Sequence, residues 1–238
     1  MRAAIGGVKN ALKRIPVVAP LVRRALGIYR KATFPGSSTY WKDRYAEGGN
    51  SGRGSYGAFA EFKAEVINGL IRELGIGSTI EFGCGDGAQL AQGAYGRYIG
   101  LDVSPEAIRA CARRFAGDTT KSFFLYDPTC FIDHHGLFRA ELALSLDVIY
   151  HLTEDAVFEA YMRHLFASGS RYVVIYSNDS AEYSPAPHIK YRRFSDWIGV
   201  HAAEWVLWRR IPNRFPHTGD DRTGSPSDFF VYSCEKQL

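Results

Sequence analysis

Three glycines at alternate positions are the feature of this chain with the clearest chemical meaning. The segment Ile80–Ala88 has the sequence Ile-Glu-Phe-Gly-Cys-Gly-Asp-Gly-Ala, and it continues a short apolar run that begins at Ser78. Glycine has no Cβ, so the backbone can turn sharply at these positions and come close to a ligand. The helix-like run Gln89–Ala91 follows, and the first N–H groups of a helix are free to bind a polar group. The segment therefore predicts a turn that binds a nucleotide or a nucleoside.

An acidic residue lies where such a site needs one. Asp102 ends the apolar segment Arg97–Asp102, 21 positions after Glu81. Dinucleotide-binding folds place a carboxylate about 20 residues beyond the glycine turn, where it binds the ribose hydroxyls. Ser104 is a good helix N-cap, and Pro105 suits the first helical position. A strand, a candidate ribose-binding acid and a helix start thus follow one another here.

The order of these segments resembles that of class I S-adenosylmethionine-dependent methyltransferases. The glycine turn resembles the first motif of that family, Asp102–Ile108 its second, and Asp147–Leu152 the segment after its fourth strand. The resemblance covers residues 78–177. Gly83, Gly85 and Ala88 also fit the G-x-G-x-x-A pattern of dinucleotide sites, so NAD is the alternative cofactor.

This resemblance assigns a set of residues to the cofactor S-adenosylmethionine. It implies that Glu81 and the glycines lie against the methionine part, that Asp102 binds the ribose, and that Asp127 binds the adenine edge. It also implies that the aromatic segment Tyr40–Tyr45 closes over the site. The expected cofactor-binding residues are Tyr45, Glu81, Gly83, Cys84, Gly85, Asp102, Val103, Tyr126, Asp127 and Leu146. The structural alternatives are a capping role for Asp102, an ordinary turn at Asp127 and a groove-filling Tyr45.

Three residues are candidate catalytic groups that remove a proton from a methyl acceptor. Asp147 and His151 follow the fourth predicted strand, at the sheet edge where ligands of open α/β sheets bind, and His188 lies beyond the fifth. An unperturbed imidazole titrates near pH ~6.5, which makes His151 our first candidate. The alternative is a structural histidine at a helix start.

A divalent metal is a second possibility at this edge. Asp147 with Asn178 and Asp179 resembles the metal-binding triad of metal-dependent O-methyltransferases, and oxygen ligands suit Mg²⁺. We find no matching charged partner for such a site. We therefore favour a reaction without metal and keep Mg²⁺ as the alternative.

The whole pattern resembles bacterial methyltransferases that modify sugars and surface glycans. The matching segments are Tyr40–Tyr56, Phe62–Glu65, the glycine turn, Lys121–Pro128 and Ser145–His151. The resemblance implies O-methylation of a hydroxyl on a sugar or glycan precursor. Two alternatives stay open: N- or O-methylation of another small metabolite, and a non-catalytic membrane-associated scaffold that retains the fold.

Alternating strand and helix patterns position these residues. The apolar face of residues 57–74 predicts a helix that Gly75 ends, and further helices are expected after Thr153 and over 194–200. Strands are expected at 78–82, 97–102, 122–125, 142–146, 170–176, 205–211 and 228–233. This alternation predicts an α/β, Rossmann-like, doubly wound sheet of seven strands, mostly parallel with a terminal antiparallel pair, and with helices on both faces.

Charge separates the front of the chain from its body. The net charge is +4, but the first 40 residues hold eight of the 29 basic residues and none of the 25 acidic ones. We expect residues 1–38 to form a basic amphipathic helical appendage and linker, and residues 39–238 the methyltransferase domain. The appendage either contacts an anionic membrane surface or packs on the domain or on a second subunit of a homo-oligomer.

Composition narrows the compartment and the partners. Hydrophobic residues make up 46% and charged residues 23%, as in a globular protein. The four cysteines form no C-x-x-C pair, which argues against zinc and favours the cytoplasm, with the inner face of the membrane as an extension. The body has no basic excess, so we expect a small-molecule or glycan acceptor and no nucleic acid.

Overall fold

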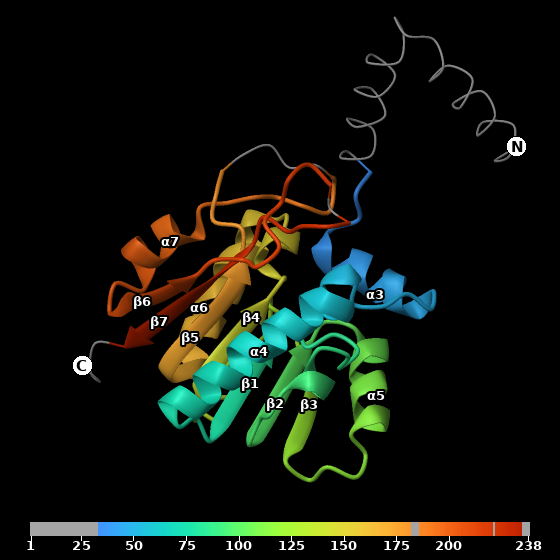
Figure 1. The fold of residues 1–238 in the computed structure, drawn as a ribbon. Helices are drawn as coiled ribbons and strands as arrows, with labels where there is room; N and C mark the ends of the chain where they lie inside the picture. Colours follow the sequence, from blue (N-terminus) through green and yellow to red (C-terminus); the bar gives the residue numbers. More distant parts are fainter. Residues whose placement is uncertain (1–32, 182–185, 221, 235–238) are drawn as a thin grey trace, which may run out of the picture.

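The predicted parallel strands form the centre of a seven-stranded mixed sheet (Figure 1). The computed structural model describes residues 33–181, 186–220 and 222–234. Its strands are β1 (Ser78–Phe82), β2 (Arg97–Asp102), β3 (Lys121–Leu125), β4 (Ala140–Leu146), β5 (Gly169–Ser177), β6 (Trp205–Ile211) and β7 (Asp228–Cys234). The order is β3-β2-β1-β4-β5-β7-β6, with β7 antiparallel to both of its neighbours. The predicted fold class is confirmed.

Helices cover both faces of this sheet, as Figure 1 shows. They are α3 (Ser37–Ala46), α4 (Gly57–Leu74), α5 (Pro105–Arg114), α6 (Asp155–Ser168) and α7 (Phe194–His201). Along β1, Ile80 and Phe82 point to the core that contains α6 and α7. On the other face, α4 packs through Phe62, Ile67 and Leu70 on apolar side chains of β4, β5 and β7. This alternation follows from the period of two along a strand.

Two helix boundaries, the start of α5 and the end of α4, lie where the sequence predicts them. The Ser104 hydroxyl accepts a hydrogen bond from the Ala107 N–H at 3.3 Å, and Pro105 is the first residue of α5. At the end of α4, Gly75 adopts the left-handed conformation with φ 60°. Such a conformation is cheap only for glycine, which explains why the helix ends there.

The segment after the glycine turn differs from the prediction. Gln89–Ala91 does not start an α-helix, because the chain makes turns after Gly83 and then only one 3-10 turn at Leu90–Gln92. Gly83, Gly85 and Gly87 all have positive φ, and Gly93 and Gly96 follow. Glycine at this density disfavours a helix, so the N–H groups that face the site belong to turns.

Two further expectations about helix starts are wrong in detail. The N-cap of α6 is Glu154 and not Thr153, and neither side chain caps this helix. Helix α3 begins at Ser37, inside the segment expected to be a linker. Residues 1–32 of the predicted helical appendage lie outside the described residues.

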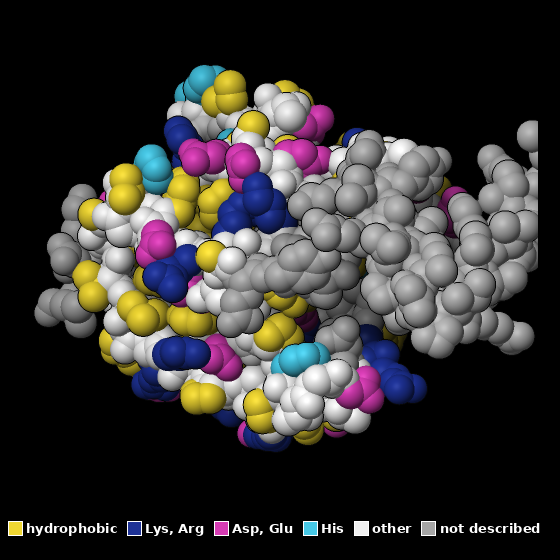
Figure 2. Space-filling model, turned by 90° about the horizontal axis from the view of Figure 1, so that it is seen from above, with side chains coloured by type: hydrophobic (Ala, Val, Ile, Leu, Met, Phe, Trp, Pro, Cys, Tyr) yellow, Lys and Arg dark blue, Asp and Glu magenta, His cyan; other side chains and the backbone are white. Residues whose placement is uncertain are grey.

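Within the described ranges, no helix is long and apolar enough to cross a membrane. Figure 2 shows basic and acidic side chains next to one another over the described part of one face. Ion pairs between described residues include Lys190–Asp155 and Arg210–Asp228.

Candidate active site

A cavity opens at the carboxyl ends of β1, β2 and β4. This is the point where the connections leave β1 and β4 in opposite directions, which is where open α/β sheets bind their ligands. Nine of the ten expected cofactor residues line the cavity, namely Tyr45, Glu81, Gly83, Cys84, Gly85, Asp102, Val103, Tyr126 and Leu146. Asp147 and His151 line it as well. Residues that follow the ends of different strands in the sequence therefore line one cavity.

The glycine turn needs glycine for two reasons. Gly83 has φ 85° and Gly85 has φ 59°, where a side chain is strained. A Cβ on Gly83 would also lie 2.5 Å from Val148 Cγ2, and a Cβ on Gly85 would collide with Ser51 Oγ. Val148 and Ser51, which also line the cavity, therefore pack directly on the glycine backbone.

Polar contacts hold the segment after α3 against this turn. The hydroxyls of Tyr45 and Ser51 lie 2.8 Å apart, and the Asp86 N–H donates to Ser51 Oγ at 3.1 Å. The Tyr56 hydroxyl donates to Asp86 Oδ2 at 2.6 Å. Tyr45 is buried and reaches the cavity, whereas Arg44 donates to the Asn50 carbonyl on another surface.

Two buried carboxyls give the cavity its electrostatic character. Asp102 accepts hydrogen bonds from the N–H groups of Gly85 and Ser104, each at 2.9 Å, and burial raises its pKa to about 6. Glu81 accepts a bond from the Tyr98 hydroxyl at 2.6 Å, and burial raises its pKa to about 7. A cationic ligand in the cavity would stabilise the ionised form of both carboxyls, which burial disfavours.

Gln89 belongs to the cavity although we did not predict it. Its side-chain N–H donates to the Ala60 carbonyl at 3.1 Å. Its Oε1 is buried and has no hydrogen-bond partner among the described residues. An unpaired buried acceptor costs ~1–3 kcal/mol, so a donor on a ligand would stabilise it. The glutamine in an otherwise apolar run after the turn is the signal that sequence analysis passed over.

Asp127 lies outside the cavity. Its carboxyl is exposed and accepts bonds from the N–H and hydroxyl of Thr129 at 2.9 and 2.7 Å. This is the ordinary turn that the sequence left as the alternative. Tyr126 and Pro128, on either side of it, do line the cavity. The adenine role of Asp127 stays a prediction that this geometry does not favour.

Two partners hold the Asp147 side chain at the carboxyl end of β4. Its Oδ2 lies 2.7 Å from Lys63 Nζ, and its Oδ1 accepts a bond from the Tyr150 hydroxyl at 2.9 Å. Asp147 has φ 60° and is the one non-glycine residue with positive φ in the described part of the chain. The Lys63 side chain is only 1% exposed and lines the cavity. Lysine is seldom buried this deeply unless it is paired.

His151 presents one nitrogen with a lone pair. Its Nδ1 lies 3.0 Å from the His188 carbonyl oxygen, which can only accept, so Nδ1 carries the proton and Nε2 does not. Burial lowers the pKa of His151 to about 4 and keeps the ring neutral. The His188 ring does not line the cavity but stacks between Tyr40 and His151, with centroids 4.9 and 5.6 Å away. His188 therefore positions His151.

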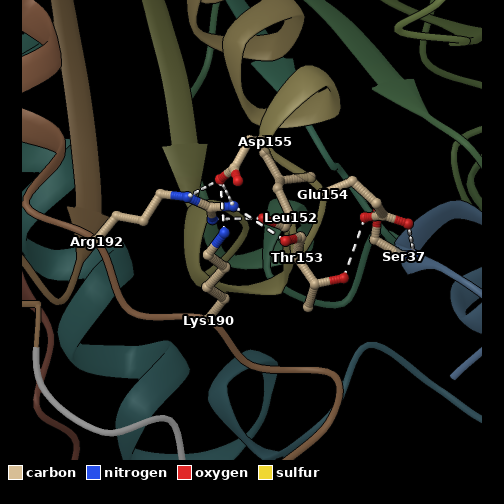
Figure 3. A network of polar contacts seen from close by, with 7 residues as sticks. All are labelled: Ser37, Leu152, Thr153, Glu154, Asp155, Lys190 and Arg192. Carbon is tan, nitrogen blue, oxygen red and sulfur yellow. Dashed lines mark hydrogen bonds and ion pairs between the residues drawn. The ribbon is translucent and has the colours of Figure 1, made fainter. Parts of the chain in front are cut away.

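Two of the three cations of the 190–193 segment attach it to helix α6. Lys190 and Arg192 both contact Asp155, at 2.6 and 2.8 Å, and Figure 3 shows them converging there. In the same view Glu154 turns toward Ser37 and accepts bonds from its N–H at 2.8 Å and its hydroxyl at 2.7 Å. These contacts fasten α3 and the 190–193 segment to the start of α6, next to His151.

The residues do not fit a metal site. Asp147 is already paired with the Lys63 cation and accepts the Tyr150 hydroxyl, and Asp179 accepts the Ser195 N–H at 3.1 Å. No cluster of three or more His, Cys, Asp or Glu side chains suited to a metal occurs among the residues that the structure describes.

Comparison with known proteins shows the fold. No protein-family model matches the chain, and no curated protein does. Magnesium protoporphyrin IX methyltransferase (ChlM) from Synechocystis, solved with S-adenosylhomocysteine, is 15% identical with a TM-score of 0.58, over 83% of this chain and 97% of that one. The N-methyltransferase NodS from Bradyrhizobium japonicum, with the same compound, is 14% identical with a TM-score of 0.55, over 73% and 85%. The methyltransferase domain of bacterial CtHen1 is 18% identical with a TM-score of 0.56, over 73% and 97%. The chain is thus similar in fold to methyltransferases of differing acceptors.

Proposed function

We propose that this protein is an S-adenosylmethionine-dependent methyltransferase. The observation that carries the proposal is the cavity at the ends of β1, β2 and β4. Its buried acceptors, Glu81, Asp102 and the unpaired Gln89 Oε1, suit a ligand that brings an ammonium, a sulfonium and ribose hydroxyls. The fold neighbours ChlM and NodS, solved with S-adenosylhomocysteine, support the same choice.

The bound cofactor supplies a methyl group on a positively charged sulfur. The acceptor oxygen forms a bond to the methyl carbon as the carbon–sulfur bond breaks, and the acceptor loses its proton. Most of the catalysis is then placement of the acceptor. Asp147 can orient the acceptor hydroxyl, and the free Nε2 of His151 can take the proton. The pKa of about 4 makes His151 a weak base, so Asp147 is the competing assignment.

We propose further that the acceptor is a hydroxyl of a sugar or glycan precursor. The support is the resemblance of the Tyr40–Tyr56, Lys121–Pro128 and Ser145–His151 segments to bacterial glycan-modifying methyltransferases. Another small metabolite is the second candidate. A scaffold without activity is the third, and loss of cofactor binding would favour it.

Calorimetry with S-adenosylmethionine, S-adenosylhomocysteine and NAD tests the cofactor. We expect micromolar binding of the first two and none of NAD, and the reverse preference would end the proposal. Asp102→Ala should weaken binding by ~1–3 kcal/mol, the size expected for hydrogen bonds to a charged group. Glu106→Ala, on the exposed side of α5, is the matched control.

A screen of sugar nucleotides and lipid-linked glycans for transfer of labelled methyl tests the acceptor. Once an acceptor is found, His151→Ala should lower turnover by ~10²–10⁴-fold while cofactor affinity changes little. Asp147→Asn tests the competing base. Normal rates in both variants would place the base elsewhere.

A further inference from the structure

A second cavity meets the first at Asp147 and His151. It lies between the 3-10 turn at Arg53–Ser55, the start of α4, the end of β5 and the 189–191 and 224–227 segments. Only Asp147 and His151 line both cavities. The two candidate catalytic groups therefore form the wall between two binding spaces.

We propose that this second cavity binds the methyl acceptor, and that the acceptor is a ring-shaped polyhydroxyl compound, a pyranose, held with a C–H face on aromatic rings. This inference rests on the proposed function and extends it. No residue of this cavity other than the two shared ones was expected from the sequence.

The aromatic lining carries the choice of ligand class. Phe59, Tyr150, Tyr176 and Tyr191 all line the cavity. The face of an aromatic ring is the negative end of its quadrupole, so the weakly positive C–H groups of a sugar ring pack on it. An aromatic lining of this kind suits packing against the C–H face of a pyranose ring.

Hydrogen-bonding groups lie between these faces. The Asp147 carboxylate is an acceptor for a hydroxyl, with lone pairs left after its bonds to Lys63 and Tyr150. The buried Ser227 hydroxyl also lines the cavity and has no partner among the described residues. A ligand with several hydroxyls satisfies both, whereas a purely apolar ligand leaves Ser227 unpaired.

Gly54 keeps the approach to Asp147 open. It lines the second cavity and not the first, and a Cβ there would lie 2.6 Å from Asp147 Oδ2. No left-handed conformation requires glycine at this position. The missing side chain therefore leaves room beside the carboxylate, where a hydroxyl of the ligand can reach it.

Saturation-transfer NMR on the full chain, saturated with S-adenosylhomocysteine, tests this proposal. The probes are methyl β-D-glucopyranoside, methyl β-D-galactopyranoside and methyl α-D-mannopyranoside, with sorbitol as the acyclic polyol without a ring face. We expect transfer to the ring C–H protons of at least one glycoside and little to sorbitol. In Tyr191→Ala the signal should fall about five- to tenfold, as for loss of one aromatic contact.

Two further variants complete the design. Gly54→Ala should abolish the glycoside signal by filling the space at Asp147, and it keeps the aromatic lining if Tyr191→Ala fails to fold. Phe124→Ala removes a 43% exposed ring on the edge strand β3 and should change nothing. Normal S-adenosylhomocysteine binding without any glycoside signal, or with a signal that neither cavity variant alters, would overturn this proposal alone. Failure to bind S-adenosylhomocysteine would overturn the proposed function itself.

Discussion

The buried carboxyl of Glu81 makes cofactor binding depend on pH in a calculable way. Burial raises its pKa to about 7, so about half of the molecules carry an ionised Glu81 at pH 7 and about a tenth at pH 6. If a cationic cofactor binds the ionised form, affinity should fall about fivefold from pH 7 to pH 6, or by about 1 kcal/mol. Asp102, with a pKa of about 6, adds a factor of about two.

Isothermal titration calorimetry measures this directly. Between pH 6 and 7 the amino group of the cofactor stays mostly protonated, because α-amino groups titrate near ~7.7–8.0. In two buffers of different ionisation enthalpy, the wild type should release protons on binding at pH 6.5. Glu81→Gln should bind more weakly at pH 7 and lose most of the pH dependence, whereas Glu106→Gln should behave as wild type. Equal affinities at the two pH values, with no proton release, would refute a role for ionised Glu81.

Three other predictions follow from the same structure. Because burial lowers the pKa of His151 to about 4, the unfolded chain binds more protons between pH 4 and 6.5, so stability should fall on acidification by up to ~3 kcal/mol. Urea unfolding of His151→Gln and of wild type, compared across this pH range, isolates the contribution of His151 to stability. The raised pKa of Glu81 gives the opposite pH dependence and is present in both proteins. Lys63→Met should cost ~3–5 kcal/mol by leaving Asp147 unpaired, with partial recovery when Asp147→Asn is added. Deleting residues 1–32 should leave cofactor binding intact and abolish low-salt sedimentation with anionic vesicles. A full-length protein that does not bind such vesicles would refute membrane contact by the N-terminal appendage.

That Gly83, Asp102 and Asp147 line one cavity could be predicted, because each stands at a strand end or directly after one in the sequence. The glycines follow one strand directly, and Asp102 and Asp147 stand at the ends of two others. In a parallel sheet these ends meet at one edge, so a correct strand assignment is enough to bring the residues together. Nothing beyond the order of the strands was needed.

Lys63 could not be predicted from such local rules. It stands on the buried side of α4 between Phe59 and Ile67, where helical spacing indicates core packing. A lysine in that stripe is a signal, but its meaning depends on Asp147, 84 positions away. Val157 and Tyr161 of α6 also line the first cavity, and strand order alone does not predict their place there.

The lining of the second cavity could not be predicted from the sequence for a different reason. Its wall combines Phe59, Tyr150, Tyr176, Tyr191 and Ser227, which come from separate segments that adopt no shared pattern. Tyr191 and Ser227 lie in loops, and loops vary more in sequence than the helices and strands they connect. Fold neighbours such as ChlM and NodS accordingly share the architecture with this chain but carry names that point to different acceptors.

Asp147 lines both cavities, and its backbone conformation needs support from its neighbours. A non-glycine residue at φ 60° carries strain of about 1–3 kcal/mol, and the conformation persists only where the surrounding structure holds it. Lys63 and Tyr150 supply that fixation through both carboxylate oxygens. Asparagine tolerates the same left-handed conformation, so Asp147→Asn removes the charge and keeps the backbone. Alanine would add backbone strain to the lost charge. If methyl transfer depends on the charge of Asp147 at the junction of the two cavities, the asparagine variant should lose turnover and keep its cofactor affinity. It should also lose some stability, because the buried Lys63 ammonium loses its charged partner.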